Sequence, residues 1–208
     1  MTDDVSASAI PDVKKSDATD VIGPIANRWS PRAFLDKPVD KATIHALLDA
    51  ARWAASSNNE QPWRYMVATK ENAAEFAKLV SILVPKNQLW ASKAPVLMLS
   101  IAKKTFTYHG KPNRHYLHDT GAATQLLGIQ AAAMGLQIHS MGGFDMEKSR
   151  ATFNIPNDFE PAAAIAIGYP GPPENAAEEF RAGETSPRTR KALGEMAFEG
   201  TFGTAFKG

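Results

Sequence analysis

The chain has 208 residues, of which 44% are hydrophobic and 22% are charged, a balance typical of a globular protein with one sizeable core. Its 23 Lys and Arg residues against 22 Asp and Glu residues leave a formal net charge of +1, which argues against nucleic acid or an acidic membrane as a partner. The absence of cysteine excludes disulfides, thiol nucleophiles and zinc–thiolate sites, and we expect a reducing compartment, the cytoplasm.

The first twenty residues carry scattered charges and no apolar run, so they look like neither a signal peptide nor a membrane anchor. We expect a flexible arm over residues 1–20 and a single folded domain over 21–208. Asp40 precedes apolar residues at helical spacing, which predicts a capped amphipathic helix up to about Ala54. After a polar stretch, residues 64–69 alternate as a strand does.

A second helix is predicted over about 71–83, and the continuous apolar run 94–102 is typical of a buried strand. Residues 103–119 mix aromatic, histidine and basic side chains without a period, as an exposed lid or excursion does. Residues 120–137 form a predicted central helix rich in Ala and Gly, with Asp119 as its cap.

A short helix over 146–153 and another buried strand over 162–171 complete the predicted elements. Helices interleaved with four or five strands indicate a helix-covered sheet, but the regular spacing of a doubly wound fold is missing. The sequence also lacks the G-x-G-x-x-G, P-loop, G-x-S-x-G and H-E-x-x-H motifs. The enzyme classes that these motifs mark are therefore disfavoured.

Two arginines and a serine alternate just before the first long helix. Arg28, Ser30 and Arg32 lie on one side of the chain if the backbone is extended, and they could present two guanidinium groups and a hydroxyl to one ligand. Guanidinium is planar, permanently charged and bidentate toward phosphate, so a phosphorylated cofactor is one interpretation. Surface arginines that remain in water are the other.

A polar cluster follows the first long helix. It contains five neutral hydrogen-bonding side chains: Ser56, Ser57, Asn58, Asn59 and Gln61. These groups suit a polyhydroxyl chain or the edge of a heteroaromatic ring. A helix stop and turn fixed by Asn59 and Pro62 is the alternative, and it accounts for only part of the cluster.

Two further segments carry candidate binding residues. Gly142 and Gly143 precede a predicted helix, so their bare backbone could approach a flat ligand or simply form a tight turn. Arg188 and Arg190, with Lys191 beside them, form a basic group that could complete a phosphate site or stay solvated.

Taken in order, these segments resemble the FMN-dependent nitroreductase family. The resemblance rests on the Arg28-x-Ser30-x-Arg32 motif and on the segments ASSNNEQPWRY, LWASKAPVLML, HDTGAATQLLGIQAAAMGL, SMGGFD and IAIGYP. It covers nearly everything from Ile25 to the C-terminal region. It implies an α+β fold, an α/β/α sandwich around a mostly antiparallel mixed sheet, and an intertwined homodimer with FMN at the interface.

The resemblance also implies a role for each candidate. Arg28 and Ser30 would hold the phosphate and ribityl end of FMN, and Arg32 would lie near the pyrimidine edge of the flavin. Ser56, Ser57, Asn59 and Gln61 would reach the flavin from the other subunit. Met141, Gly142 and Gly143 would meet the ring edge, although many relatives have a Glu where this chain has Gly142. Arg188 and Arg190 would meet the phosphate.

The implied activity is a ping-pong reduction of a nitroaromatic or quinone-type acceptor with hydride from NAD(P)H. No side chain needs to act as acid, base or nucleophile, so no catalytic residue is assigned. Three alternatives stay open: a reductive dehalogenase or flavin-destroying enzyme of the same fold, a flavin-binding store or sensor without turnover, and a different phosphate ligand.

Two outer segments complete the predictions. In the lid over 103–118, Phe106, Tyr108 and Tyr116 would either stack on an acceptor or pack locally, and we favour local packing. His115 and His118 beside Asp119 suggest a metal, but zinc needs a third protein ligand, and we predict no metal site. Residues 192–208, with phenylalanines but also glycines, are expected to form a dimer arm.

Overall fold

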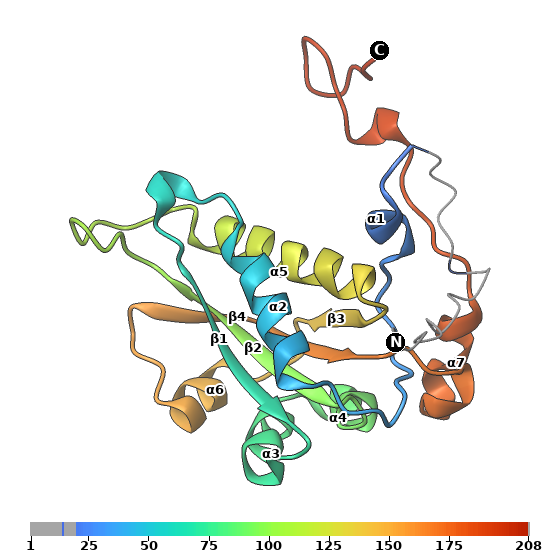
Figure 1. Cartoon of the computed structure of the whole chain (residues 1–208). Coiled ribbons are helices and arrows are strands. Elements are labelled where there is room, and N and C mark those ends of the chain that lie inside the picture. Colours follow the sequence, from blue (N-terminus) through green and yellow to red (C-terminus); the bar gives the residue numbers. More distant parts are fainter. Residues whose placement is uncertain (1–13, 15–19, 208) are drawn as a thin grey trace, which may run out of the picture.

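The structure, a computed structural model, describes Lys14 and residues 20–207, so most of the predicted arm over 1–20 lies outside the described residues. Its centre is a four-stranded sheet with the strand order β1-β2-β4-β3 (Figure 1). The strands are β1 (Trp63–Thr69), β2 (Val96–Lys103), β3 (Gln137–Met141) and β4 (Phe159–Gly168). All three pairings are antiparallel, so the sheet formed by the described residues is antiparallel and not mixed.

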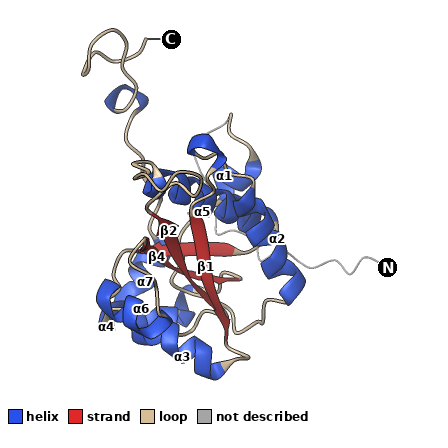
Figure 2. Cartoon of the chain, turned by 90° about the vertical axis from the view of Figure 1, so that its left-hand side faces the viewer, coloured by secondary structure: helices blue, strands red, loops and turns tan. Residues whose placement is uncertain are grey.

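Helices cover both faces of this sheet (Figure 2). One layer consists of α2 (Lys41–Arg52) and α5 (Tyr116–Ala133), with the short α1 (Gly23–Asn27) packed on α5. The other layer contains α3 (Ala73–Ser81), α4 (Pro85–Ala91), α6 (Met146–Phe153) and α7 (Glu178–Thr185). The predicted α+β sandwich is therefore confirmed for the single chain.

Strand β2 explains why both layers are needed. Its first seven residues are all buried, as expected of a central strand that is covered on both faces. Because side chains alternate along a strand, Leu97 and Leu99 join the core beneath α3 and α4, while Val96 and Met98 join the core beneath α2 and α5. The apolar run seen in the sequence therefore contributes to two separate cores, one on each face of the sheet.

Side-chain caps fix the start of three helices. The Asp40 carboxylate accepts a hydrogen bond from the Thr43 backbone N–H at 2.7 Å, which confirms the predicted cap of α2. Asn72 and Asp145 cap α3 and α6 in the same way. Helix α6 has the predicted bounds, and α3 is shorter than predicted because its cap lies at Asn72.

The prediction for the central helix was wrong at both ends. Helix α5 begins at Tyr116, so Asp119 lies inside its first turn and is not its cap. The Asp119 carboxylate instead accepts a hydrogen bond from the Ser57 backbone N–H at 2.9 Å. At the other end the helix stops at Ala133, and Gln137 begins β3, a strand too short and too polar to be recognised from the sequence.

Several short elements were also missed. They are α4, which starts at Pro85, α7 within the Pro- and Glu-containing connector, and the 3-10 turns η2 (Ser57–Asn59), η3 (Pro173–Asn175) and η4 (Leu193–Glu195). The excursion after β2 contains a hairpin-like bridge between Thr105 and Pro112. The segment after η4 projects away from the rest of the chain (Figure 1).

Candidate functional site

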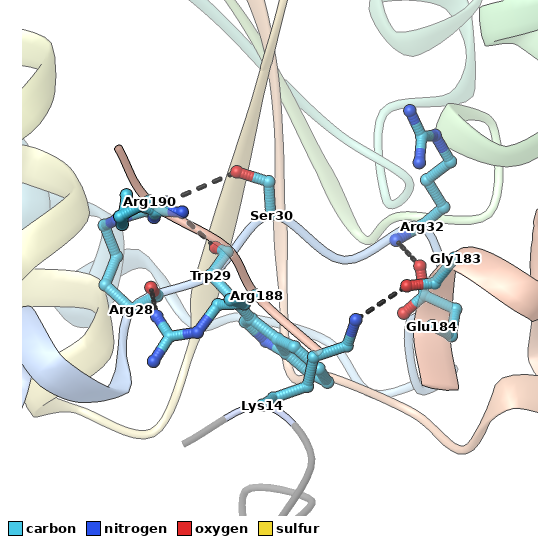
Figure 3. A pocket seen from close by; sticks show the side chains of 9 residues that line it. All are labelled: Lys14, Arg28, Trp29, Ser30, Arg32, Gly183, Glu184, Arg188 and Arg190. Carbon is cyan, nitrogen blue, oxygen red and sulfur yellow. Dashed lines mark hydrogen bonds between the residues drawn. The ribbon is translucent and has the colours of Figure 1, made fainter. Parts of the chain in front are cut away.

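A pocket of about 200 Å³ lies between the segment after α1, the end of α7 and the basic group of the tail (Figure 3). Five cationic side chains and one carboxylate line it. The lining residues are Lys14, Arg28, Trp29, Ser30, Arg32, Gly183, Glu184, Arg188 and Arg190. So many cations around so few anions favour a negatively charged ligand.

The segment 28–32 has the alternation predicted for an extended chain. Trp29 and Pro31 are buried, whereas Arg28, Ser30 and Arg32 are more exposed and line the pocket. Strand β3 holds this segment in place. The Gln137 side-chain carbonyl accepts a hydrogen bond from the Trp29 N–H at 3.0 Å, and His139 Nδ1 lies 3.0 Å from the Pro31 carbonyl oxygen.

The left half of the pocket in Figure 3 brings Arg28, Ser30, Arg188 and Arg190 together. An Arg28 guanidinium nitrogen, Nη1, lies 3.3 Å from Ser30 Oγ, and Arg188 Nη1 donates to the Arg28 carbonyl oxygen at 2.6 Å. Burial, with the nearby charges of Arg190 and Arg188, lowers the pKa of Arg28 from its ordinary value. An anion here would relieve this repulsion.

Arg32 belongs to the other half of the pocket. Its backbone N–H donates to Glu184 Oε1 at 2.8 Å, and its guanidinium carbon lies 5.1 Å from the Phe180 ring centre. Figure 3 shows this side chain turned away from Ser30. Within the described residues its buried Nε atom has no hydrogen-bond partner. The three alternating residues therefore line one pocket, but their side chains do not all point in the same direction.

The polar cluster over 56–61 does not join this pocket within one chain. Ser57 is bonded to Asp119 in the first turn of α5, whereas a side chain at Gly128, nine residues further along the helix, would contact Arg28 at 3.9 Å. At 1.5 Å per residue, nine helical residues span about 13 Å. The two predicted groups of cofactor-binding residues therefore lie near opposite ends of α5.

Much of the cluster's hydrogen-bonding capacity is used internally. Ser56 Oγ accepts from the Gln61 N–H at 3.0 Å, and Gln61 Nε2 donates to Asn59 Oδ1 at 3.1 Å. The backbone is also unusual, because Asn59 and Gln61 have φ angles of 54° and 52° in the left-handed region. Asparagine tolerates this region, but glutamine rarely adopts it, so the turn holds local strain.

The Gly142–Gly143 turn is fixed from α4. The Gly143 carbonyl accepts hydrogen bonds from the Val84 N–H at 3.1 Å and from Asn87 Nδ2 at 2.9 Å. A Cβ at Gly143 would lie 2.6 Å from Asn87 Nδ2, so a side chain here would displace the amide that donates to the Gly143 carbonyl. A Cβ at Gly142 would meet nothing within 4 Å. The turn thus leaves open space at Gly142, next to the buried Met141.

Sequence reasoning missed three residues around the pocket: Lys14, His139 and Glu184. Lys14 and Glu184 lie in charged segments without a motif, and only the fold brings them to the pocket. His139 alternates with buried residues in β3, but β3 itself was not predicted. Burial lowers the pKa of His139 to about 4, an effect reinforced by nearby Arg32 and Arg28, so this side chain is neutral at pH 7.

The histidine and aspartate at the start of α5 form a pair and not a larger cluster. His118 Nδ1 lies 3.0 Å from Asp119 Oδ1. Across Lys14 and residues 20–207, no group of three or more His, Cys, Asp or Glu side chains is placed to hold a metal ion. Over the same residues, none of the helices combines the length and the hydropathy that a membrane span requires.

The chain is similar to several known proteins. It is 34% identical to a structure described as an oxidoreductase containing FMN, with a TM-score of 0.84 over 90% of this chain and 96% of that chain. An uncharacterised 15.4 kDa protein of Mycolicibacterium smegmatis is 39% identical over 90 residues, which are 43% of this chain and 60% of that relative.

A third relative, from Archaeoglobus fulgidus, is 25% identical over 150 residues, 70% of this chain and 83% of its own length. Its name provisionally assigns it as an NADH dehydrogenase or NAD(P)H nitroreductase. The family model described as the nitroreductase family matches residues 25–169, which include the extended segment 28–32, the polar cluster and the Gly142–Gly143 turn. The chain therefore belongs to the nitroreductase family of oxidoreductases.

Proposed function

We propose that the protein is an FMN-dependent oxidoreductase that takes hydride from NAD(P)H and reduces nitroaromatic or quinone-type acceptors by a ping-pong mechanism. The observation that carries this proposal is the pocket lined by five cationic side chains, formed around the Arg28-x-Ser30-x-Arg32 motif in a nitroreductase-family chain. The similarity to an FMN-containing oxidoreductase supports it.

The residues of the pocket fit the phosphate end of FMN. Guanidinium groups and a serine hydroxyl are suitable donors for phosphate oxygens. Arg32 Nε, in the other half of the pocket, lacks a partner among the described residues and would donate to the flavin end of the same ligand. Arg28, Ser30 and Arg190 would bind the phosphate, while Arg188 would hold the Arg28 backbone in place. The nearby positive charge of Arg32 would favour a reduced, anionic ring.

When bound, FMN would supply the redox centre, accepting hydride from NAD(P)H and passing it to the acceptor. The chain's own contribution would then be binding and orientation, and no side chain is assigned proton transfer. Met141, Gly142 and Gly143 would meet the ring edge, with Gly143 held by Asn87. The open space at Gly142 leaves this contact to the backbone.

We also propose a homodimer whose second subunit completes each site. Within one chain the polar cluster lies far along α5 from the pocket, so Ser56, Ser57, Asn59 and Gln61 would serve the site of the partner. The exposed Leu117, Gly121 and Gln125 line one side of α5, beside a cleft of about 360 Å³. An apolar residue (Leu117) and a small one (Gly121) on an exposed helix face suit close packing against a second copy, with Gln125 as a hydrogen-bonding group beside them.

The domain boundaries of this proposal follow the sequence predictions. Residues 21–208 would form one FMN-binding domain, and 192–208 would form a dimer arm. The lid predicted over 103–118 would act toward the acceptor through residues 104–115, because Lys103 ends β2 and Tyr116 already begins α5. A cytoplasmic location stays a prediction from the missing cysteines and the proposed use of NAD(P)H.

The test is an absorbance spectrum of the purified protein, with FMN added if necessary, before and after anaerobic NADH or NADPH. We expect stoichiometric flavin that bleaches and then reoxidises with a nitroaromatic or a quinone. Flavin that is bound but not bleached by either reductant would indicate a store or sensor. A protein that binds no FMN would contradict the proposal and leave the pocket to another phosphate ligand.

A further inference from the structure

Lys14 is the one residue described before residue 20, and its side chain is almost fully buried in the pocket (Figure 3). Its ammonium group donates hydrogen bonds to the carbonyl oxygens of Gly183 and Ser186, each at 2.6 Å. It also lies 5.3 Å from the centre of the Trp29 ring. Lys14 therefore bridges the end of α7 and the segment that carries Arg28 and Ser30.

A lysine ammonium group has three N–H donors, and the two carbonyls account for two of them. The group lines the same pocket as Arg28 and Arg188. Burial lowers the pKa of Lys14, and Arg188 adds to this, while the nearby Glu184 carboxylate opposes it. A buried cation among other cations is expensive unless an anion joins them.

Glu184 is the one carboxylate among the described residues that line the pocket, and its charge offsets only part of the repulsion among the five cations. Its side chain is buried, and Oε1 accepts the Arg32 backbone N–H at 2.8 Å, so it holds the other half of the pocket. Lys14 lies between Glu184 and the cluster of Arg28, Ser30 and Arg188 in Figure 3. Its remaining donor is thus available to a ligand that occupies the pocket.

We propose that Lys14 is a direct phosphate-binding residue of this pocket, closing it opposite Arg190 and coupling α7 to the bound anion. The proposal deepens the proposed function, because it rests on the pocket holding the phosphate of FMN. It adds a lysine from outside the segment that matches the family model, which begins at residue 25.

The test compares FMN with riboflavin, which has the same ring and ribityl chain but no phosphate. Lys14→Met keeps an unbranched side chain to pack on Trp29 but removes the charge, and Lys14→Arg restores it. Lys41→Met, at an exposed lysine on α2, is the matched control. We expect Lys14→Met to weaken FMN binding by about tenfold, the effect of one charge-assisted hydrogen bond, with riboflavin binding unchanged.

Lys14→Arg and Lys41→Met are expected to bind FMN nearly as the wild type does. An equal loss of affinity for FMN and riboflavin in Lys14→Met would show that Lys14 only supports the local structure, and it would overturn the proposal. Unchanged FMN affinity in Lys14→Met would also overturn it. Thermal stabilisation of the same variants by inorganic phosphate gives a second readout. A wild type that is stabilised by phosphate but binds no FMN would refute the proposed cofactor, whereas loss of phosphate stabilisation in Lys14→Met would still identify Lys14 as an anion ligand.

Discussion

Arg28 lies half-buried beside two other arginines, and its own carbonyl accepts a hydrogen bond from Arg188. Each of these positive charges disfavours the charged form of its neighbours until an anion is bound. His139 lies behind the same segment, packed against Trp90 with 4.4 Å between ring centres and the rings tilted by 43°. It tolerates this electropositive site only because it is neutral.

Arg28→Ala removes the guanidinium that lies beside Ser30. We expect it to weaken FMN binding by about 1.5–3 kcal/mol, the usual contribution of a charge-assisted hydrogen bond. Calorimetric titration of the flavin-free protein with FMN measures the change. Ser57→Ala, which removes a neutral group, is expected to cost less. Unchanged affinity in Arg28→Ala would place the phosphate elsewhere.

Protonation of His139 links stability to pH. The pKa of His139 is about 4 in the folded state against an ordinary value of 6.5, so the unfolded chain binds the extra proton first. The contribution of neutral His139 to the free energy of unfolding is fully present above pH 6.5 and is lost as the pH falls toward 4. The shift corresponds to about 3 kcal/mol of unfolding free energy.

His139→Gln keeps a donor for the Pro31 carbonyl but removes the titration. We expect its unfolding free energy to fall less than that of the wild type between pH 6.5 and 4, measured by denaturant titration at each pH. Because the carboxylates titrate in both proteins, the difference between the two curves isolates His139. Parallel curves would show that this histidine does not resist protonation.

At the scale of elements, the excursion after β2 is tied to the polar cluster. Both oxygens of Glu60 accept hydrogen bonds from Thr107, one from its backbone N–H at 2.9 Å and one from its hydroxyl at 2.5 Å. Lys103 Nζ lies 3.5 Å from Glu60 Oε1. Thr107 and Lys103 together lower the pKa of Glu60 despite its burial, which opposes them. The proposed lid and the proposed partner-binding turn are therefore joined by hydrogen bonds and an ion pair.

Glu60→Ala removes this tie. We expect faster backbone amide hydrogen exchange over residues 104–113, because the hairpin loses its attachment and opens locally. Mass spectrometry of exchanged peptides measures the effect, and the exposed Glu71 supplies the control variant Glu71→Ala. Exchange that stays at the wild-type rate in this segment would show that the hairpin is held by its own aromatic contacts.

Those contacts are consistent with the local packing predicted for the lid aromatics. Phe106 lies 5.7 Å from Tyr108 and 5.1 Å from His109 between ring centres. Tyr108 nevertheless remains 65% exposed. Packing within the hairpin thus leaves one aromatic side chain on its surface.

At the scale of the whole molecule, the tail exposes apolar side chains that the described chain does not cover. Phe202 is 92% exposed and Leu193 is 77% exposed, although Phe198 and Phe202 pack together at 4.8 Å. Gly200 and Gly203 have positive φ angles, so the tail turns at both glycines and does not form one long helix. A second copy of the chain is the occupant that we propose for this surface.

Deletion of residues 198–208 tests the arm. We expect a lower dimer fraction in analytical ultracentrifugation and a lower unfolding temperature, because the apolar contacts with the partner would be lost. The basic group at 188–190 is retained, so each chain keeps its own phosphate-binding residues, and only the contacts proposed from the partner would be lost with the dimer. A truncated protein that stays fully dimeric, stable and active would contradict the arm.

The sequence by itself determined the elements whose signals are local. The Asp40 cap, the apolar period of α2 and the continuous apolar run of β2 specify their structures without help from distant residues. The alternation of Arg28, Ser30 and Arg32 was equally local, because it needs only an extended backbone with Trp29 and Pro31 pointing inward. The family resemblance related these separate segments to one another within a single fold.

Only the tertiary structure decided the rest, because it depends on contacts between residues that are far apart in the chain. Strand β3 forms because β4 pairs with it. Asp119 accepts a hydrogen bond from Ser57, and does not cap α5, because the helix starts about one turn before the predicted position. Glu184 bonds to Arg32 across 152 residues, and Lys14 bonds to Gly183 and Ser186 across 169 and 172 residues, so neither was predicted. Burial then turned these ordinary charged residues into one electropositive pocket, which no local pattern in the sequence encodes.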